Sequence, residues 1–245
     1  MLFNLAHKNF IEFLYYFYID VDGRNNMLNK KQQQNKLALF ILSMVSIIFV
    51  LSLMMYTKAH AASEGDWLVR FGAVQVNPND SSGTLSGAPT VGVAVDGDTQ
   101  AFANISYMLT NNVALELLAA TPFTHTISAT GALSGDIATA KQLPPTLSLQ
   151  YHFLPTSSVS PYVGAGLNYT TFFDEQATAV ITQISMEDSW GLALQVGADF
   201  EMKDGWFANL DLRYIDIETT ATTNLGTIDV TIDPWVFSAG VGFKF

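Results

Sequence analysis

The sequence predicts an all-β protein, an eight-stranded antiparallel transmembrane β-barrel that follows a cleaved signal peptide. Eight runs of about ten residues alternate between apolar and mostly small or polar side chains, the period of a strand with two different faces. The connections between these runs alternate between short turns and long loops. Hydrophobic residues make up 49% and charged residues 13% of the chain, yet no stretch after residue 61 is long and apolar enough for a membrane helix. Strands that turn half of their residues toward lipid explain this combination.

The chain begins with segments that we expect to be absent from the mature protein. Residues 27–61 contain Lys30, Lys31 and Lys36, then an uncharged run over 37–56 and then Ala59-His60-Ala61. A basic region, an apolar region and a small-x-small site predict a secretory signal peptide that is cleaved after Ala61. The uncharged run is longer than usual for a signal peptide, which leaves a retained membrane helix as the alternative. Residues 1–26 fit no part of a signal peptide, so we expect them to be a misassigned upstream extension.

The mature chain, residues 62–245, is strongly acidic and has no cysteine. The first 61 residues carry three of the 22 acidic and six of the 11 basic residues, which leaves a net charge of about −14. Nucleic-acid binding is therefore excluded as an expected function, because it requires a basic surface. The absence of cysteine excludes disulfides and thiolate chemistry.

The alternating runs define the predicted strands and the way they are connected. The runs cover 67–76, 99–109, a third that starts at 113, 146–153, 161–173, 190–200, 206–217 and 235–245. The short connections are 110–112, 154–160 and 202–205, and the long ones are 77–98, 120–145, 174–189 and 218–232. Outer-membrane barrels combine short periplasmic turns with long extracellular loops. An even number of strands closes the sheet, so that no backbone edge faces lipid.

The last run shows the alternation most clearly. Apolar residues occupy odd positions from Trp235 to Phe245, and small or polar residues occupy even positions from Ser238 to Lys244. Ten tilted residues span roughly 25 Å, the height of the apolar band of such a barrel. The terminal aromatics Phe243 and Phe245 resemble the C-terminal assembly signal of outer-membrane proteins, which implies the barrel assembly machinery as a partner. Trp67, Trp190, Trp206 and Trp235 lie near strand ends and predict an interfacial girdle.

The same alternation places charged side chains inside the barrel. These are Arg70, Glu116, Asp199, Asp211, Arg213 and Lys244, together with Glu201. Charges are costly to bury unless they are paired. Two interpretations remain open: a structural ion-pair network that plugs the lower lumen, or a polar constriction that controls passage.

Leu118 is a large apolar residue on the inner face of the third strand. Phe123 and Ile127 continue the apolar character toward the extracellular end. An apolar funnel above a polar floor would accept a hydrophobic solute and refuse ions, and a solute stopped by the floor would leave sideways through the wall. The alternative is that Leu118 only packs the core.

Several segments resemble the outer membrane protein W family. They are Val113–Phe123, Leu143–Leu147, Pro161–Phe173, Asp188–Gly191 and Asp233–Phe237, and the likeness covers nearly all of residues 62–245. The resemblance implies an eight-stranded barrel in the outer membrane of a Gram-negative bacterium, with a narrow, partly apolar lumen. It also implies passive uptake of small hydrophobic molecules, with colicins as candidate partners. Arg213 stands where relatives tend to have an aromatic residue.

We therefore expect a narrow channel for small hydrophobic solutes. The alternative is a plugged barrel that binds colicins, phage or host surfaces through its long loops. We expect no catalytic residues, no metal site and no cofactor. Of the two histidines in residues 62–245, His125 lies in the second long loop and His152 alternates inward. The spacing places neither of them in a catalytic set. A lipid-facing wall without an unusual polar patch favours a monomer embedded in outer-membrane lipid.

Overall fold

The computed structural model of the protein describes residues 62–88, 90–178 and 181–245. The predicted upstream extension and signal peptide lie outside these residues. In the part of the chain that is described, no helix is long and apolar enough to cross a lipid bilayer.

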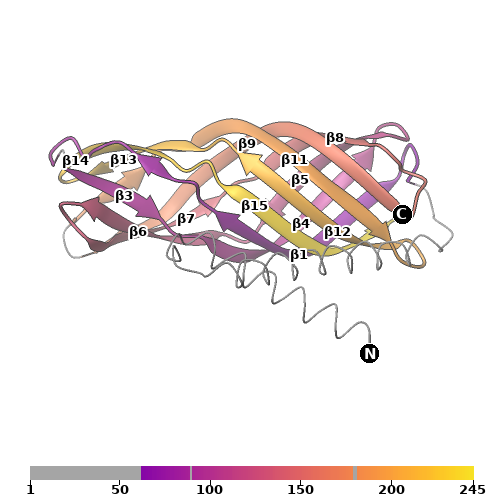
Figure 1. Cartoon of the computed structure of the whole chain (residues 1–245), viewed down its shortest axis with the longest axis horizontal. Coiled ribbons are helices and arrows are strands. Elements are labelled where there is room, and N and C mark those ends of the chain that lie inside the picture. The colour runs from indigo at the N-terminus through magenta and orange to yellow at the C-terminus, as the bar shows by residue number, and fades with distance from the viewer. Residues whose placement is uncertain (1–61, 89, 179–180) are drawn as a thin grey trace, which may run out of the picture. The chain divides into compact units, whose positions relative to one another are not determined.

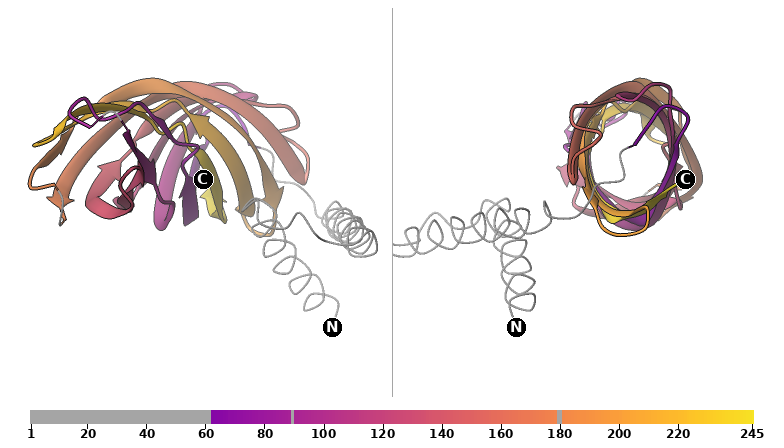
Figure 2. Two further views of the ribbon diagram at one scale, coloured as in Figure 1. Left: turned by 60° about the vertical axis from the view of Figure 1, so that its left-hand side comes forward. Right: turned by 90° about the vertical axis from the view of Figure 1, so that its right-hand side faces the viewer.

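Eight antiparallel strands form a closed barrel, which confirms the predicted fold (Figures 1 and 2). Each strand pairs with its neighbours in chain order, and the last strand pairs with the first. In chain order the strands are β1 (Trp67–Asn77), β4 (Asp98–Met108), β5 (Val113–Ala120), β8 (Thr146–His152), β9 (Val159–Ala177), β11 (Ser189–Glu201), β12 (Trp206–Ile215) and β15 (Trp235–Lys244). Their bounds agree closely with the alternating runs, except that β9 extends beyond both ends of its run.

The long connections contain strands that the sequence did not predict. They are β2 (Ser81–Ser82), β3 (Val91–Val95), β6 (Phe123–Gly131), β7 (Gly135–Leu143), β10 (Ile184–Met186), β13 (Glu218–Thr223) and β14 (Gly226–Thr231). In Figure 1, β3, β6, β7, β13 and β14 gather at the end of the barrel opposite the C-terminus. In these segments mostly threonine, serine and alanine alternate. Because these residues differ little in hydrophobicity, the sequence pattern does not indicate a strand.

These additional strands lengthen the barrel beyond its eight-stranded part. β7 pairs with the last part of β9, β6 pairs with β7, and β3 pairs with β6. A second sheet has the order β10-β13-β14-β2. Because outer-membrane barrels place their long connections outside the cell, this extension is the extracellular end.

The two faces of the wall differ as the alternation predicts. Large apolar side chains such as Leu117, Leu149 and Leu192 are exposed on the outside, where lipid would cover them. The residues between them are buried in the lumen. The predicted girdle tryptophans are also exposed, with Trp67 and Trp206 at the short-turn end and Trp190 and Trp235 at the long-loop end.

The first and last strands close the barrel through a seam of close backbone contacts. Trp67 N–H donates to Phe245 O at 2.8 Å, and Phe245 N–H donates to Trp67 O at 3.1 Å. Farther along the seam, Gly72 lies opposite Gly240. A Cβ atom on either glycine would overlap backbone atoms of the other strand, so the close approach requires both glycines.

Candidate functional site

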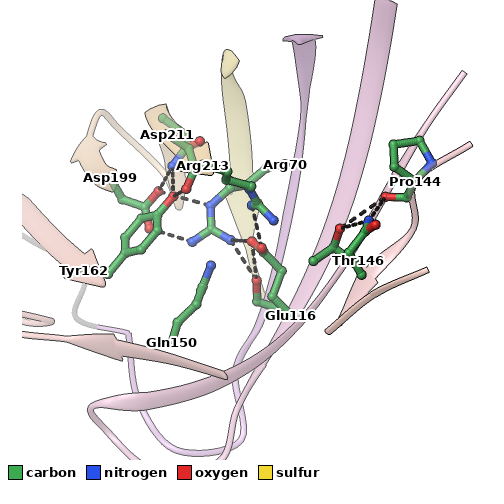
Figure 3. A network of polar contacts seen from close by, with 12 residues as sticks. Arg70, Glu116, Pro144, Thr146, Gln150, Tyr162, Asp199, Asp211 and Arg213 are labelled. Atoms are coloured by element: carbon green, nitrogen blue, oxygen red, sulfur yellow. Dashed lines mark hydrogen bonds and ion pairs between the residues drawn. The ribbon is translucent and has the colours of Figure 1, made fainter. Parts of the chain in front are cut away.

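Charged side chains from β1, β5, β11 and β12 meet in one buried network inside the barrel (Figure 3). Arg70 holds Asp199 at two points, from Nε to Oδ1 at 3.1 Å and from Nη2 to Oδ2 at 2.7 Å. Arg70 Nη1 donates to Ser106 Oγ at 2.8 Å and lies 3.5 Å from Glu116 Oε2. Such two-point pairing is the strongest arrangement between a guanidinium and a carboxylate.

Arg213 forms the second half of this network, and Glu116 joins the two halves. Arg213 Nη2 donates to Glu116 Oε1 at 2.6 Å, and Arg213 Nε donates to Asp211 Oδ1 at 2.7 Å. Glu116 is thus shared between the two arginines, and it is fully buried. Two guanidinium groups face three carboxylates, and each of these five groups has at least one partner of opposite charge.

Tyr162 and Asn209, two residues that are not among the predicted channel residues, complete the network. The Tyr162 hydroxyl donates to Asp211 Oδ2 at 2.9 Å and accepts from Asn209 Nδ2 at 2.9 Å. Asn209 Nδ2 also donates to Asp199 Oδ1 at 2.8 Å. Both residues alternate inward on their strands, and this inward position is the signal that the sequence offers for them.

Inward glycines provide the space for these large side chains. Gly197 faces the Tyr162 ring, and an added Cβ would overlap the Tyr162 hydroxyl. At Gly164 an added Cβ would lie 2.8 Å from Gln195 Cγ. The Arg70 guanidinium lies 5.6 Å from the Tyr162 ring centroid and 5.3 Å from that of Phe207, within the range of cation–π contact. The lower lumen is therefore filled with side chains rather than open.

Of the seven residues predicted to line the channel, six are buried in the lumen, and five of those belong to this network. The five are Arg70, Glu116, Asp199, Asp211 and Arg213, which we call the ionic floor. Lys244 lies apart, half-buried at the short-turn end. There it lines a cavity of about 30 Å³ together with Asp199, Glu201 and His152. The sixth lumen residue, Leu118, lies above the ionic floor.

Leu118 belongs to the apolar half of the lumen. It is buried in a cluster with Val74, Phe102, Ile215 and Val236. The cluster continues into the extracellular extension through Phe123, Phe172, Ile217, Val230 and Ile232. The interior thus changes from charged to apolar at the level of Leu118, and the apolar part reaches the long-loop end.

The extracellular extension encloses a separate apolar cavity of about 40 Å³. Aliphatic side chains from both sheets of the extension line it, together with one threonine. They include Leu85, Val91, Ile127, Ile137, Ile184 and Ile228. We call the apolar half of the lumen and this cavity together the vestibule.

The barrel wall lacks backbone pairing beside the vestibule. Pairing of β5 with β8 ends at Leu118 and Thr146, and pairing of β6 with β7 begins at Phe123 and Gln142. Among the described residues no backbone bond joins 119–122 to 143–145. Pro144 and Pro145 have no N–H to donate, and their carbonyls accept from Asn168 Nδ2 at 3.1 and 3.2 Å. The prolines remain joined to β9 on their other side, where Tyr169 N–H donates to Pro145 O at 3.1 Å, so the gap lies between 119–122 and 143–145 alone.

Comparisons with known proteins agree with this architecture. The family model described as OmpW family matches residues 63–245. The chain is 44% identical to outer membrane protein W of Vibrio cholerae over 80% of this chain and 96% of that protein. It is 30% identical to the dibenzothiophene metabolism operon protein PahQ of Pseudomonas aeruginosa, over 75% of this chain and 90% of that protein.

A solved structure shows the same fold. The crystal structure of the outer membrane protein OprG from Pseudomonas aeruginosa superposes with a TM-score of 0.73 at 39% identity. The match covers 76% of this chain and 98% of that one. From the family match, the relatives and the closed barrel, we conclude that this chain is an outer-membrane β-barrel protein that belongs to the OmpW family.

Proposed function

We propose that this protein is a narrow channel for the passive uptake of small hydrophobic molecules across the outer membrane. The observation that carries the proposal is the division of the lumen into an apolar vestibule and an ionic floor. An eight-stranded barrel has room only for side chains or for one small ligand. A wide aqueous pore is therefore incompatible with this interior, whereas a small apolar solute fits the vestibule.

The chemistry of the vestibule favours apolar solutes over ions. Its walls are almost entirely aliphatic and aromatic, and an ion that leaves water for such surroundings loses its hydration without compensation. Below it, the paired charges of the ionic floor already bind one another, so a passing ion finds few partners. The expected result is uptake of apolar molecules without steady ionic conductance.

The wall beside Pro144 and Pro145 supports a sideways exit into the membrane. A solute that reaches Leu118 meets the ionic floor below it and the unpaired stretch of wall beside it. Parting residues 119–122 from 143–145 breaks no backbone hydrogen bond between them. The solute then enters the hydrocarbon region without crossing the charged network.

The relatives are consistent with this class of solute. One of them is named for a dibenzothiophene metabolism operon, and dibenzothiophene is an apolar polycyclic molecule. That name describes the relative, and it supports a hydrophobic solute here without identifying it.

The proposal is tested with the full chain expressed in, and purified from, outer membranes. The protein is reconstituted into vesicles with a lipopolysaccharide outer leaflet, and entry of a small apolar reporter is followed together with ionic conductance. We expect protein-dependent reporter entry and no steady conductance.

Leu118→Asp places a charge in the vestibule and should lower protein-dependent entry by about tenfold or more. Leu118→Met, which keeps an apolar side chain of similar size, should retain it.

The same experiment separates the alternative, a plugged barrel that binds colicins, phage or host surfaces. The ordered strands of the extension favour this alternative, because they present a built surface outside the membrane. It predicts no reporter entry, normal partner binding in Leu118→Asp, and loss of binding when the β13–β14 hairpin is shortened. Unchanged reporter entry in a folded Leu118→Asp barrel would contradict the channel proposal.

A further inference from the structure

We infer that His125 and Gln142 form a polar subsite in the vestibule that binds the hydroxyl group of an otherwise apolar solute. The inference rests on the proposed function and makes its solute class more specific, from hydrophobic molecules in general to apolar alcohols and phenols. Two buried side chains with unused hydrogen-bonding atoms carry it.

The hydrogen bond that His125 already makes determines what the ring can still bind. His125 is buried, and its Nδ1 lies 2.7 Å from the backbone oxygen of Asp96. A carbonyl oxygen only accepts, so Nδ1 must carry the hydrogen. In the neutral ring Nε2 is then an acceptor, and this atom is buried without a partner. The free position of His125 therefore calls for a ligand that donates a hydrogen.

Gln142 provides the complementary groups. It is 1% exposed, and neither its amide nitrogen nor its amide oxygen has a partner. In register it lies between Phe123 on β6 and Phe172 on β9, both buried. An amide buried between aromatic side chains without a hydrogen bond is costly, and a small molecule that accepts from the amide nitrogen removes part of that cost.

The two side chains lie on paired strands and along one path through the vestibule. His125 follows Phe123 by two residues on the inner face of β6, and their rings are stacked with centroids 6.3 Å apart. Two residues farther along the same face, Ile127 lines the apolar cavity. A solute with its apolar body among the aliphatic residues of the cavity can thus present a hydroxyl to His125 and Gln142.

A hydroxyl group can bond one free atom of each side chain, whereas a hydrocarbon, an ether, a ketone or a carboxylate cannot. It donates to His125 Nε2 and accepts from the Gln142 amide. A hydrocarbon does neither, an ether or ketone only accepts, and a carboxylate brings a charge into an apolar site. The subsite therefore favours a neutral, hydroxylated apolar molecule over the hydrocarbon of the same shape.

The test compares two probes of nearly the same shape, p-cresol and p-xylene, which differ by a hydroxyl in place of a methyl group. The full chain, purified from outer membranes and labelled with ¹⁵N-glutamine, is titrated in lipid nanodiscs while the Gln142 side-chain amide signal is followed by NMR. We expect p-cresol to bind about fivefold to tenfold more tightly than p-xylene, the size expected for one or two net hydrogen bonds. The Gln142 signal should shift with p-cresol.

Substitutions identify the groups responsible. His125→Phe keeps a flat ring and removes the acceptor, and Gln142→Leu keeps the approximate volume and removes the amide. Each variant should bring the ratio of the p-cresol and p-xylene affinities close to one. In Gln142→Leu, which lacks the side-chain amide, binding is followed by ligand-induced shifts of backbone signals. Gln100→Leu is the matched control, because the Gln100 amide already donates to Asp98 and accepts from Thr121. It should retain the preference of the parent protein.

Each outcome has a distinct meaning. Equal affinity of both probes for the parent protein, or a preference that survives in both variants, would overturn the subsite and leave the channel proposal standing. Bound water alone at His125 and Gln142 would give that same result. Binding of neither probe, together with no reporter entry in vesicles, would overturn the channel proposal as well.

Discussion

The two halves of the lumen differ in what surrounds their buried polar groups. In the ionic floor every carboxylate has at least one guanidinium partner, and Tyr162 and Asn209 add hydrogen bonds to Asp211 and Asp199. Arg213 Nη1 and Asn209 Oδ1 have no partner there, but the groups around them are charged or polar. In the vestibule polar side chains are rare, and His125 and Gln142 retain buried atoms without partners. Charges that pair with one another are suited to hold the barrel shut, whereas unpartnered polar atoms in an apolar space are suited to receive a ligand.

The difference also shows in what lines the remaining space. Glycines in the lower half leave space that neighbouring side chains occupy, as Gln195 does beside Gly164, and the small cavity at its short-turn end is lined by charged residues such as Asp199 and Lys244. The upper half retains a cavity lined by aliphatic residues between two sheets. We therefore expect substitutions in the ionic floor to affect stability first, and substitutions in the vestibule to affect solutes first.

The largest expected effect tests the ionic floor. Glu116→Ala removes the carboxylate shared by Arg70 and Arg213, while Arg70 still pairs with Asp199 and Arg213 with Asp211. The variant loses one charged hydrogen bond to each arginine. Each such bond contributes about 1.5–3 kcal/mol, so the free energy of unfolding should fall by about 3–5 kcal/mol. It is measured by urea unfolding in vesicles, followed by tryptophan fluorescence. Glu187→Ala, at an exposed position, should change it by less than about 0.5 kcal/mol, and equal losses in both variants would contradict a stabilising floor.

A smaller effect is expected from filling the space beneath Tyr162. Gly197→Ala adds a methyl group that overlaps the Tyr162 hydroxyl, so Tyr162 must move away from Asp211 and Asn209. Overpacking of this kind costs about 1–3 kcal/mol. Gly83→Ala in the extension is the matched change, because the nearest atom to its added Cβ is Asp229 O at 3.7 Å. If the same unfolding measurement shows no difference between the two variants, the lower half is less tightly filled than the structure shows.

The smallest effect is expected where an ion pair is exposed. Lys141 Nζ lies 2.7 Å from Asp174 Oδ2 in the extracellular extension. The hydrogen bond from Lys141 lowers the pKa of the Asp174 carboxyl. A lowered pKa in the folded state stabilises the protein above the pKa of the unfolded chain, and this contribution disappears as the pH falls through the folded value.

Lys141→Ala should therefore lower stability slightly at pH 7 and not at all in strong acid. Exposed pairs contribute little because solvent screens them. Unfolding curves of the variant and the parent protein at pH 7 and at pH 2–3 make the comparison. A loss as large as that of Glu116→Ala would contradict the assignment of this pair to the solvent-exposed surface.

The wall of the barrel could be predicted from the sequence, and the contents of its two ends only in part. Alternation with a period of two predicts which side chains face lipid. Successive residues of a strand point alternately to lipid, which favours apolar side chains, and to the lumen, which accepts polar ones. It also identified the charged residues of the ionic floor, although their pairing required the register between strands. Lys244 shows the limit, since it alternates inward like the others and yet lies below the network.

The extracellular end was less predictable. Neighbouring residues in its strands are mostly small and differ little in hydrophobicity, so the sequence pattern predicts loops there. The environment of Gln142 depends on pairing with both β6 and β9, which no local pattern reveals. From the sequence His125 is a loop residue that belongs to no catalytic set, and the unpartnered state of its Nε2 follows only from the structure, in which Nδ1 contacts the Asp96 backbone oxygen.

The seam between β1 and β15 has a consequence for how the protein folds. Every other pair of neighbouring barrel strands follows in chain order, whereas this pair joins the two ends of the barrel sequence. It is the most non-local contact of the fold, and such contacts form late because the whole intervening chain must first be ordered. Until then the chain is a curved sheet with two free edges, whose polar backbone groups are excluded from hydrocarbon. Entry into the bilayer and closure of the seam must therefore proceed together.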